Sequence, residues 1–315
     1  MGEMRFDGQV AIVTGAGGGL GKEYARLLAL RGAKVLVNDL GGNFAGVGAD
    51  GSYAEAAAAE ICEQGGEAAA NTLSVANSAN ANAIVQDALD RWGRVDILVN
   101  NAGIVSAAGT LDTVTDEQWE NDMAVSASGT FYMCRAVWKL MNEQQNYGRI
   151  VNIASGSWFG MGSAVPYPAA KGAVWAMTRA LASSSRATGR NVTTNVIMPI
   201  AGSRMTELMG PDIHGLMIRD FPPRAVAPVV AMLAHADAPC NGELFSVGGG
   251  GYTRVFAGVT RGYRATDKDW TMETAREQFD NVMDTDGFFI PEGSMDESSL
   301  FTSDVPWDAF RAFIQ

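Results

Sequence analysis

Short apolar runs alternate with longer helical patterns along the first 250 residues, and this alternation limits the fold more than any other feature. The runs are almost continuously apolar and rich in β-branched residues, which is typical of strands buried on both faces of a parallel sheet. We expect strands at 9–14, 34–39, 67–72, 95–100, 149–154, 191–198 and 244–247. Between them, apolar residues at three- and four-residue spacing predict helices over 21–31, 79–92, 117–141 and 167–187. The pattern predicts an α/β fold with a doubly wound parallel sheet and helices on both faces.

Two segments stand outside this alternation. A glycine-rich stretch at 41–52 is longer than a usual connection between a strand and a helix. After residue 251 the chain continues with polar and acidic turns, an arginine group and one helical pattern over 272–283. We expect residues 1–251 to form one domain, and 252–315 to be an extension that packs on this domain or on a partner subunit.

Composition narrows the classes of partner and the compartment. The chain of 315 residues has a formal net charge of −12, which argues against nucleic acid or an anionic membrane surface as partners. It contains no uncharged apolar stretch of roughly 18 residues, and its N-terminus lacks the order of a signal peptide. Cys62, Cys134 and Cys240 lie far apart, so we expect neither a disulfide framework nor a metal site. These features predict a soluble protein of the reducing cytoplasm.

A glycine loop at 14–21, TGAGGGLG, follows the first predicted strand and opens the first helix. A dinucleotide pyrophosphate binds backbone N–H groups at a helix N-terminus, and glycines allow the chain to approach it closely. We expect Gly15, Gly19, Leu20 and Gly21 to contact such a cofactor; the alternative is an ordinary tight turn. Asp39, at the end of the second strand, would accept the ribose hydroxyls and repel the extra phosphate of NADP, so NAD is favoured. A turn cap is the alternative role of Asp39.

A tyrosine and a lysine four residues apart, Tyr167 and Lys171, lie on one face of a predicted helix. Such a pair is common by chance. Ser155, however, ends the preceding strand, where open α/β sheets bind ligands. Removing an alcohol proton requires a tyrosine pKa well below about 10, and a neighbouring ammonium together with the positive nicotinamide ring would lower it. The three residues therefore point to hydride transfer between an alcohol or ketone and nicotinamide, with Ser155 bonded to the substrate oxygen.

Four motifs occur in order: TGAGGGLG (14–21), NNAG (100–103), NIAS (152–155) and YPAAK (167–171). Together they resemble the short-chain dehydrogenase/reductase family, from Arg5 to about Tyr252. The resemblance implies a Rossmann-type sheet of seven strands, a homodimer or homotetramer, and catalytic roles for Ser155, Tyr167 and Lys171. It implies further cofactor contacts at Ser74, Val75, Asn101, Ala102, Gly103, Tyr167, Lys171, Pro199 and Thr206. An N-terminal helix position is the alternative role of Thr206.

Longer segments resemble one subfamily, the dehydrogenase part of the peroxisomal multifunctional enzymes of type 2. They are NDLGGNFAGVG, NVIMPIAGSRMT, AHADAPCNGELFSVGGG and WTMETAREQFDNVMD. The likeness implies oxidation of (3R)-hydroxyacyl-CoA esters, and for some members 17β-hydroxysteroids, with NAD. Hydratase and sterol-carrier segments are not in this sequence, so we expect a freestanding relative of bacterial type.

The sequence departs from the family pattern at two positions. Ser126, seven residues after Trp119, stands where most members have the asparagine of a proton relay. A serine can still hold a water, but it lacks the amide's donor–acceptor geometry. The aspartate that commonly contacts adenine is replaced by Leu73, beside Ser74. We keep Ser126 as a catalytic candidate.

The resemblance places a substrate lid at about 203–221. We expect substrate contacts at Ser155, Ser157, Trp158, Phe159, Met205 and Met209. Residues of these types at this spacing are often core instead. A flexible apolar lid suits an acyl chain or a sterol, and Arg204, Arg219 and the arginines from Arg254 to Arg264 are candidates for CoA phosphates.

The leading hypothesis is an NAD-dependent 3-hydroxyacyl-CoA or hydroxysteroid dehydrogenase. Within enzymes, the alternative is a dehydrogenase of another bulky apolar alcohol, such as a terpenoid or an aryl carbinol. From another class, the alternative is a catalytically weak, dinucleotide-binding regulatory protein on the same fold.

Overall fold

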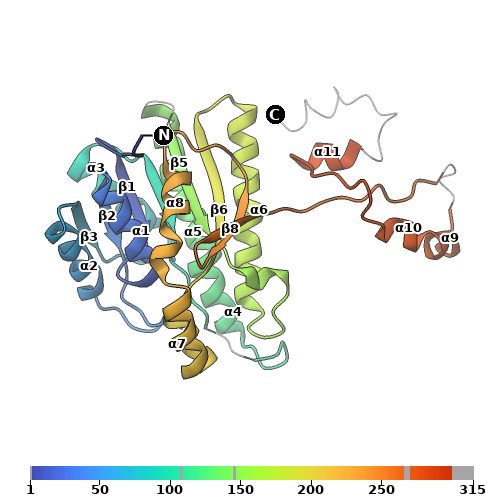
Figure 1. Ribbon diagram of the computed structural model, residues 1–315, viewed down its shortest axis with the longest axis horizontal. Coiled ribbons are helices and arrows are strands. Elements are labelled where there is room, and N and C mark those ends of the chain that lie inside the picture. Colours follow the sequence, from blue (N-terminus) through green and yellow to red (C-terminus); the bar gives the residue numbers. More distant parts are fainter. Residues whose placement is uncertain (1, 107–108, 145–146, 266–269, 300–315) are drawn as a thin grey trace. The chain divides into compact units, whose positions relative to one another are not determined.

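The computed structural model describes residues 2–106, 109–144, 147–265 and 270–299. The chain divides into two compact units, Met1–Val255 and Phe256–Gln315. The first unit contains a single sheet of eight strands in the order β3-β2-β1-β4-β5-β6-β7-β8 (Figure 1). The strands are β1 (Val10–Thr14), β2 (Lys34–Asn38), β3 (Glu67–Asn71), β4 (Ile97–Asn100), β5 (Gly148–Ile153), β6 (Val192–Ile200), β7 (Leu244–Gly248) and β8 (Gly251–Val255).

Seven strands are parallel, and β8 is an antiparallel addition that the sequence prediction of seven strands missed. Gly249 and Gly250 have φ of +58° and +83°, which turns the chain directly back beside β7. The strand is short and largely exposed, so it lacks the apolar run by which the others were predicted. The first compact unit consequently extends past residue 251, to Val255.

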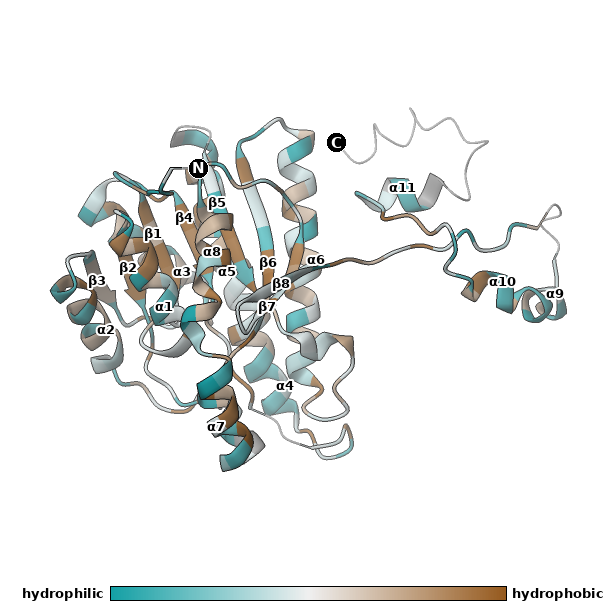
Figure 2. Cartoon of the chain, in the orientation of Figure 1, coloured by the Kyte–Doolittle hydropathy of each residue, from teal (hydrophilic) through white to brown (hydrophobic). Residues whose placement is uncertain are grey.

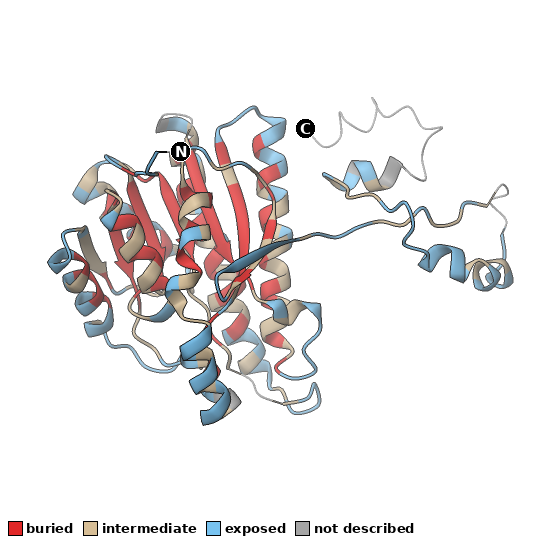
Figure 3. Cartoon of the chain, viewed as in Figure 1, coloured by how far each residue is buried: buried red, intermediate tan, exposed pale blue. Residues whose placement is uncertain are grey.

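Helices cover both faces of the sheet, and the two faces have separate apolar cores. Ala11 and Val13 of β1 contact the core of α1 (Gly19–Leu30), α2 (Ser52–Glu63) and α8 (Ala227–Ala234). Val10 and Ile12 contact the core of α3 (Ser78–Trp92) and α5 (Gly129–Gln144) on the other face. The long α6 (Pro166–Ala187) packs on this second face further along the sheet, where its Val174 meets residues of β6 and β7. The strands β1, β2, β4 and β5 are largely apolar in Figure 2 and buried in Figure 3, which explains their continuous apolar runs.

The predicted helix over 117–141 is interrupted. It consists of α4 (Asp116–Asp122), a π-helical segment η1 (Met123–Ser128) and α5. A π segment changes the hydrogen-bond spacing without changing the apolar pattern much, so periodicity does not reveal it.

Other short elements follow the carboxyl ends of the strands, which share one edge of a parallel sheet. They are η2 (Gly156–Phe159) after β5, and η3 (Arg204–Met209), α7 (Pro211–Asp220) and η4 (Pro223–Ala225) after β6. The backbone N–H of Gly202 donates to the carbonyl of Phe221 at 2.8 Å. This bond brings together the two ends of the segment between them. None of the residues of α7 is buried.

The second unit contains α9 (Met272–Glu277), α10 (Phe279–Met283) and α11 (Ser294–Ser299). The single helix predicted over 272–283 is thus two short helices. A bridge joins Val259 to Phe289, and the rings of Phe256 and Phe288 stack with centroids 5.7 Å apart. In the described ranges of both units, no helix is both long and apolar enough to span a bilayer.

Candidate active site

A pocket opens at the carboxyl edge of the sheet, between the loops that follow β1 and β4. The strand order reverses at this point, because β1 has β2 on one side and β4 on the other, and such switch points form ligand crevices. Most residues that were predicted to bind the cofactor line this pocket. They are Gly15, Gly19, Leu20, Gly21, Asp39, Ser74, Val75, Asn101, Ala102, Gly103, Tyr167, Lys171 and Pro199, with Met205 from the predicted substrate set.

The glycine loop is held against the NNAG segment by a network of short contacts. The side-chain amide of Asn101 donates to the carbonyls of Thr14 and Gly15 at 2.9 and 2.8 Å. The hydroxyl of Thr14 accepts the backbone N–H groups of Asn101 and Ala102, each at 3.1 Å. A Cβ at Gly21 would lie 2.2 Å from the carbonyl oxygen of Gly15, so only glycine fits there. The NNAG segment therefore holds the glycine loop in its conformation.

Two other glycines of the loop face open space. Gly18 and Gly19 line the pocket, and a Cβ at either would meet no atom of the described residues within 4 Å. Protein packing therefore does not require glycine at Gly18, whereas a phosphate approaching the N-terminus of α1 would. This cradle fits a dinucleotide pyrophosphate.

Asp39 follows β2 and is 8% exposed. Its two carboxylate oxygens accept the backbone N–H groups of Gly17 at 2.8 Å and Gly41 at 2.7 Å. The carboxylate thus shapes both the glycine loop and the turn after β2, as the alternative role of turn cap requires. Each carboxylate oxygen can accept a second hydrogen bond, and Asp39 lines the pocket, so a ribose contact is compatible with these bonds.

Tyr167 and Lys171 lie on the face of α6 that borders the pocket. The ammonium of Lys171 is 3% exposed and donates to the carbonyl of Ile153 at 2.7 Å. It lies 5.7 Å from the centre of the Tyr167 ring. The predicted pair therefore lies together at the end of β5, with Lys171 buried and Tyr167 half-buried.

Burial dominates the acid–base properties of this pair. It lowers the pKa of Lys171 to about 8, against an opposing effect of Asp122. It also raises the pKa of Tyr167, which a hydrogen bond with Ser155 lowers and the charge of Asp122 raises again. Without cofactor, the site does not bring the tyrosine pKa below its ordinary value, so that part of the expectation depends on the positive charge of the oxidised nicotinamide.

Ser155 and Ser126 flank the pair without lining the pocket itself. Ser155 is half-buried at the start of η2, and its hydroxyl accepts the backbone N–H of Ser157 at 3.2 Å. Ser126 is fully buried within the π segment, and its hydroxyl accepts the backbone N–H of Ile104 at 3.4 Å. A Cβ built on Gly103 would lie 3.0 Å from Nζ of Lys171 and 3.4 Å from Oγ of Ser126, so these two polar atoms converge above Gly103.

The aromatic residues after Ser155 form a stack. The ring of Trp158 lies between those of Phe159 and Trp175, with centroids 4.5 and 4.8 Å away. Trp158 packs on the core beneath β6, whereas Phe159 is 65% exposed. The geometry gives Trp158 a packing role and leaves Phe159 facing solvent.

The predicted lid residues are placed unevenly. Met205 lines the pocket, while the buried hydroxyl of Thr206 bonds to Ser203 and lies 2.8 Å from Nδ1 of His214. Thr206 completes a capping box with Ser203, which is the alternative role considered for it. The side chain of Met209 lies outside the described residues.

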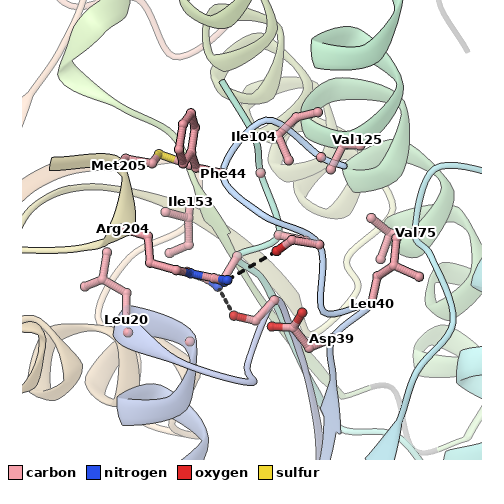
Figure 4. A pocket seen from close by; sticks show the side chains of 18 of the residues that line it. Leu20, Asp39, Leu40, Phe44, Val75, Ile104, Val125, Ile153, Arg204 and Met205 are labelled. Carbon is pink, nitrogen blue, oxygen red and sulfur yellow. Dashed lines mark hydrogen bonds between the residues drawn. The ribbon is translucent and has the colours of Figure 1, made fainter. Parts of the chain in front are cut away.

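Two contributors to the site, the long loop after β2 and Asp122, were not predicted from the sequence. The loop lines the pocket with Phe44 among others, and its unusual length was the available signal for this role. Buried Asp122 is an acidic residue in an exposed-looking stretch of sequence, and nothing there marks it. Arg204, a sequence candidate for CoA phosphates, lines the pocket and donates to the carbonyl of Gly42 at 3.2 Å (Figure 4).

Comparison with known proteins agrees with this geometry. Residues 9–212 match the family model of the short chain dehydrogenases. The chain is 41% identical over 285 residues to the peroxisomal multifunctional enzyme type 2 of Mus musculus, covering 89% of this chain and 37% of that protein. It is 36% identical over 253 residues to a 3-oxoacyl-[acyl-carrier-protein] reductase of Synechocystis, covering 77% and 96%.

A solved structure gives the same result. The full-length peroxisomal multifunctional enzyme type 2 of Drosophila melanogaster superposes with a TM-score of 0.75 at 31% identity, covering 94% of this chain and 49% of that one. The chain thus spans less than half of the two multifunctional enzymes. Motifs, fold and relatives agree: this chain belongs to the short-chain dehydrogenase/reductase family and is an oxidoreductase that acts on CH–OH groups or the corresponding ketones.

Proposed function

We propose that this protein is an NAD-dependent dehydrogenase of a bulky, apolar secondary alcohol, with 3-hydroxyacyl thioesters or hydroxysteroids as the substrates to test first. The observation that carries the proposal is the convergence of Tyr167 and Lys171 with the glycine cradle in one pocket. When bound, NAD supplies the hydride acceptor. The glycine cradle would hold its pyrophosphate and Asp39 its adenine-side ribose.

The chain's own residues have distinct tasks in this reaction. The phenol oxygen of Tyr167 takes the hydroxyl proton of the alcohol. Ser155 hydrogen-bonds the substrate oxygen and, through its bond to Tyr167, lowers the pKa of that phenol. Lys171 holds the nicotinamide ribose and contributes a positive charge beside the tyrosine ring. The fixed bond from Lys171 to Ile153 positions this charge in advance, so little rearrangement is needed when the alcohol binds.

The apolar character of the substrate rests on the segment 203–221. Ile213, Leu216 and Ile218 of α7 are 51%, 43% and 48% exposed, although each is apolar. Exposed apolar side chains on a segment next to the pocket suit a lid that closes on an apolar ligand. The acyl thioester class is supported by the name of the Synechocystis relative, a 3-oxoacyl-[acyl-carrier-protein] reductase. The predicted cytoplasmic location stays a prediction, since several relatives are named as peroxisomal.

The test is NADH formation with NAD or NADP across 3-hydroxyacyl-CoA esters, hydroxysteroids and terpene alcohols. The proposal expects turnover with NAD and at least one bulky apolar alcohol. Measurable NADH binding without turnover of any alcohol would instead favour a regulatory, dinucleotide-binding role.

A further inference from the structure

Asp122 is a buried carboxylate behind the catalytic pair that the mechanism above does not use. It ends α4, directly before the π segment, and is 0% exposed. Its Oδ1 accepts the backbone N–H of Ser106 at 2.8 Å. Its buried Oδ2 has no hydrogen-bond partner among the described residues. Burying a carboxylate with one oxygen unbonded is unfavourable, so packing alone does not account for an aspartate at this position.

The surroundings connect Asp122 to the active site. Asp122 and Ser126 are four residues apart on consecutive turns, and both bond to one stretch of loop: Asp122 to the N–H of Ser106 and Ser126 to that of Ile104. The same stretch begins at Gly103, above which Nζ of Lys171 and Oγ of Ser126 converge. Asp122 therefore lies on the same side of this loop as the ammonium of Lys171, on helices that pack against α6.

Within the described part of the chain, Asp122 and Lys171 form no direct ion pair, and the charge of Asp122 acts on Lys171 without contact. They interact through a buried region, where charges are poorly screened. Burial raises the pKa of Asp122, while hydrogen bonds from Ser106 and the charge of Lys171 lower it. The charge of Asp122 in turn raises the pKa of Tyr167.

We propose that Asp122 is the counter-ion of Lys171, a positioning residue that keeps the lysine protonated in its buried place. This inference rests on the proposed function of Tyr167 and Lys171. Ser126, at the position where the family has its relay asparagine, offers only a neutral hydroxyl. It therefore cannot compensate the positive charge of Lys171. The free Oδ2 of Asp122 carries the compensating charge.

The proposal has an unusual consequence for the pH dependence of catalysis. The negative charge of Asp122 raises the pKa of Lys171 and also that of Tyr167. Removing that charge lowers both. In alcohol oxidation, activity rises with pH as Tyr167 ionises and falls as Lys171 loses its proton. Both limbs of the profile should therefore move to lower pH together, which a loss of packing would not cause.

The experiment compares Asp122→Asn with the wild type in the pH profile of kcat/KM for the alcohol at saturating NAD. Asparagine keeps an oxygen for the N–H of Ser106 but carries no charge. We expect both limbs to shift to lower pH by about one unit. A matched control is Asp96→Asn, since Asp96 is also buried and accepts a backbone N–H, that of Val10 at 2.9 Å, at the opposite end of β4. Its profile should coincide with that of the wild type.

A second readout does not depend on turnover. Since Lys171 holds the ribose, the affinity for NADH, followed by its fluorescence, should fall as Lys171 deprotonates, and the midpoint should lie at lower pH in Asp122→Asn. If Asp122→Asn does not fold, Asp122→Ser must give the same shifts. Unshifted limbs and an unshifted binding midpoint would overturn the proposal. A shifted binding midpoint in a protein that oxidises no alcohol would retain Asp122 as counter-ion and refute the proposed function instead.

Discussion

The ammonium of Lys171 donates a 2.7 Å hydrogen bond to the carbonyl oxygen of Ile153, the last residue of β5. This bond fixes the face of α6 that carries Tyr167 to the strand end from which Ser155 follows. The relative placement of the three residues is consequently built into the fold before any ligand binds. It also confines a charged group to a place that is 3% exposed, which is unfavourable for stability.

The first prediction concerns that stability. Burial lowers the pKa of Lys171 from 10.5 to about 8, which corresponds to a loss of roughly 3 kcal/mol of folding free energy at neutral pH. Lys171→Met removes this penalty and one hydrogen bond worth about 1 kcal/mol, so we expect the variant to be about 2 kcal/mol more stable at pH 7. Urea unfolding followed by circular dichroism measures it.

The pH dependence of this gain has a definite sign. Because the folded-state pKa is depressed, the penalty is complete below pH 8 and disappears as the pH rises toward 10.5, where the unfolded chain also loses the proton. The advantage of Lys171→Met should fade across that window. A variant less stable than the wild type at pH 7 would contradict the depressed pKa.

Gly103 is predicted to be needed for catalysis because its missing side chain leaves room for the ammonium of Lys171. A Cβ there would meet Nζ of Lys171 at 3.0 Å and Oγ of Ser126 at 3.4 Å. Gly103→Ala should push the ammonium from its place and lower kcat by about tenfold, an activation free energy of about 1.4 kcal/mol. Gly172→Ala is the control, since Gly172 lies on the same helix as Lys171 and its Cβ would meet no neighbouring atom of the described residues within 4 Å. Equal kcat values in the two variants would exclude this role of Gly103.

Asp39 is predicted to set the choice between NAD and NADP. Asp39→Ala removes the charge that repels a 2′-phosphate, while Arg204 remains nearby at the carbonyl of Gly42. We expect the ratio of kcat/KM for NAD over NADP to fall at least about tenfold. Asp50→Ala, an exposed aspartate of the same loop, should leave the ratio unchanged. If Asp39→Ala keeps the wild-type ratio, Asp39 serves the loop alone, through Gly17 and Gly41.

The sequence predicted the architecture well because each buried strand has an apolar run. The core of β1 illustrates this, since Val10 and Ile12 face one layer of helices while Ala11 and Val13 face the other. The eighth strand was missed because an edge strand needs no such run. The turn before β8 needs positive φ at Gly249 and Gly250, and four consecutive glycines allow several other backbone conformations as well.

Within the site, most residues that motifs mark line one pocket, whereas the placement of residues that depends on the path of the backbone was not foreseen. Tyr167, Lys171 and the glycine loop are recognisable from spacing. Asp122 is not, because the polar stretch of α4 gives no signal that its last residue is buried. Thr206 lines no part of the pocket because its hydroxyl is used in the capping box with Ser203, a local competition that spacing does not resolve.

The central claim is that Tyr167 is the acid–base group, and Tyr167→Phe tests it most directly. The change removes one hydroxyl and leaves Lys171 bonded to Ile153 and the cradle intact. With NAD and the best alcohol of the panel, we expect NADH formation to fall by at least about a hundredfold, while the fluorescence-measured affinity for NADH stays near the wild-type value. NADH formation at the wild-type rate in Tyr167→Phe would contradict the claim.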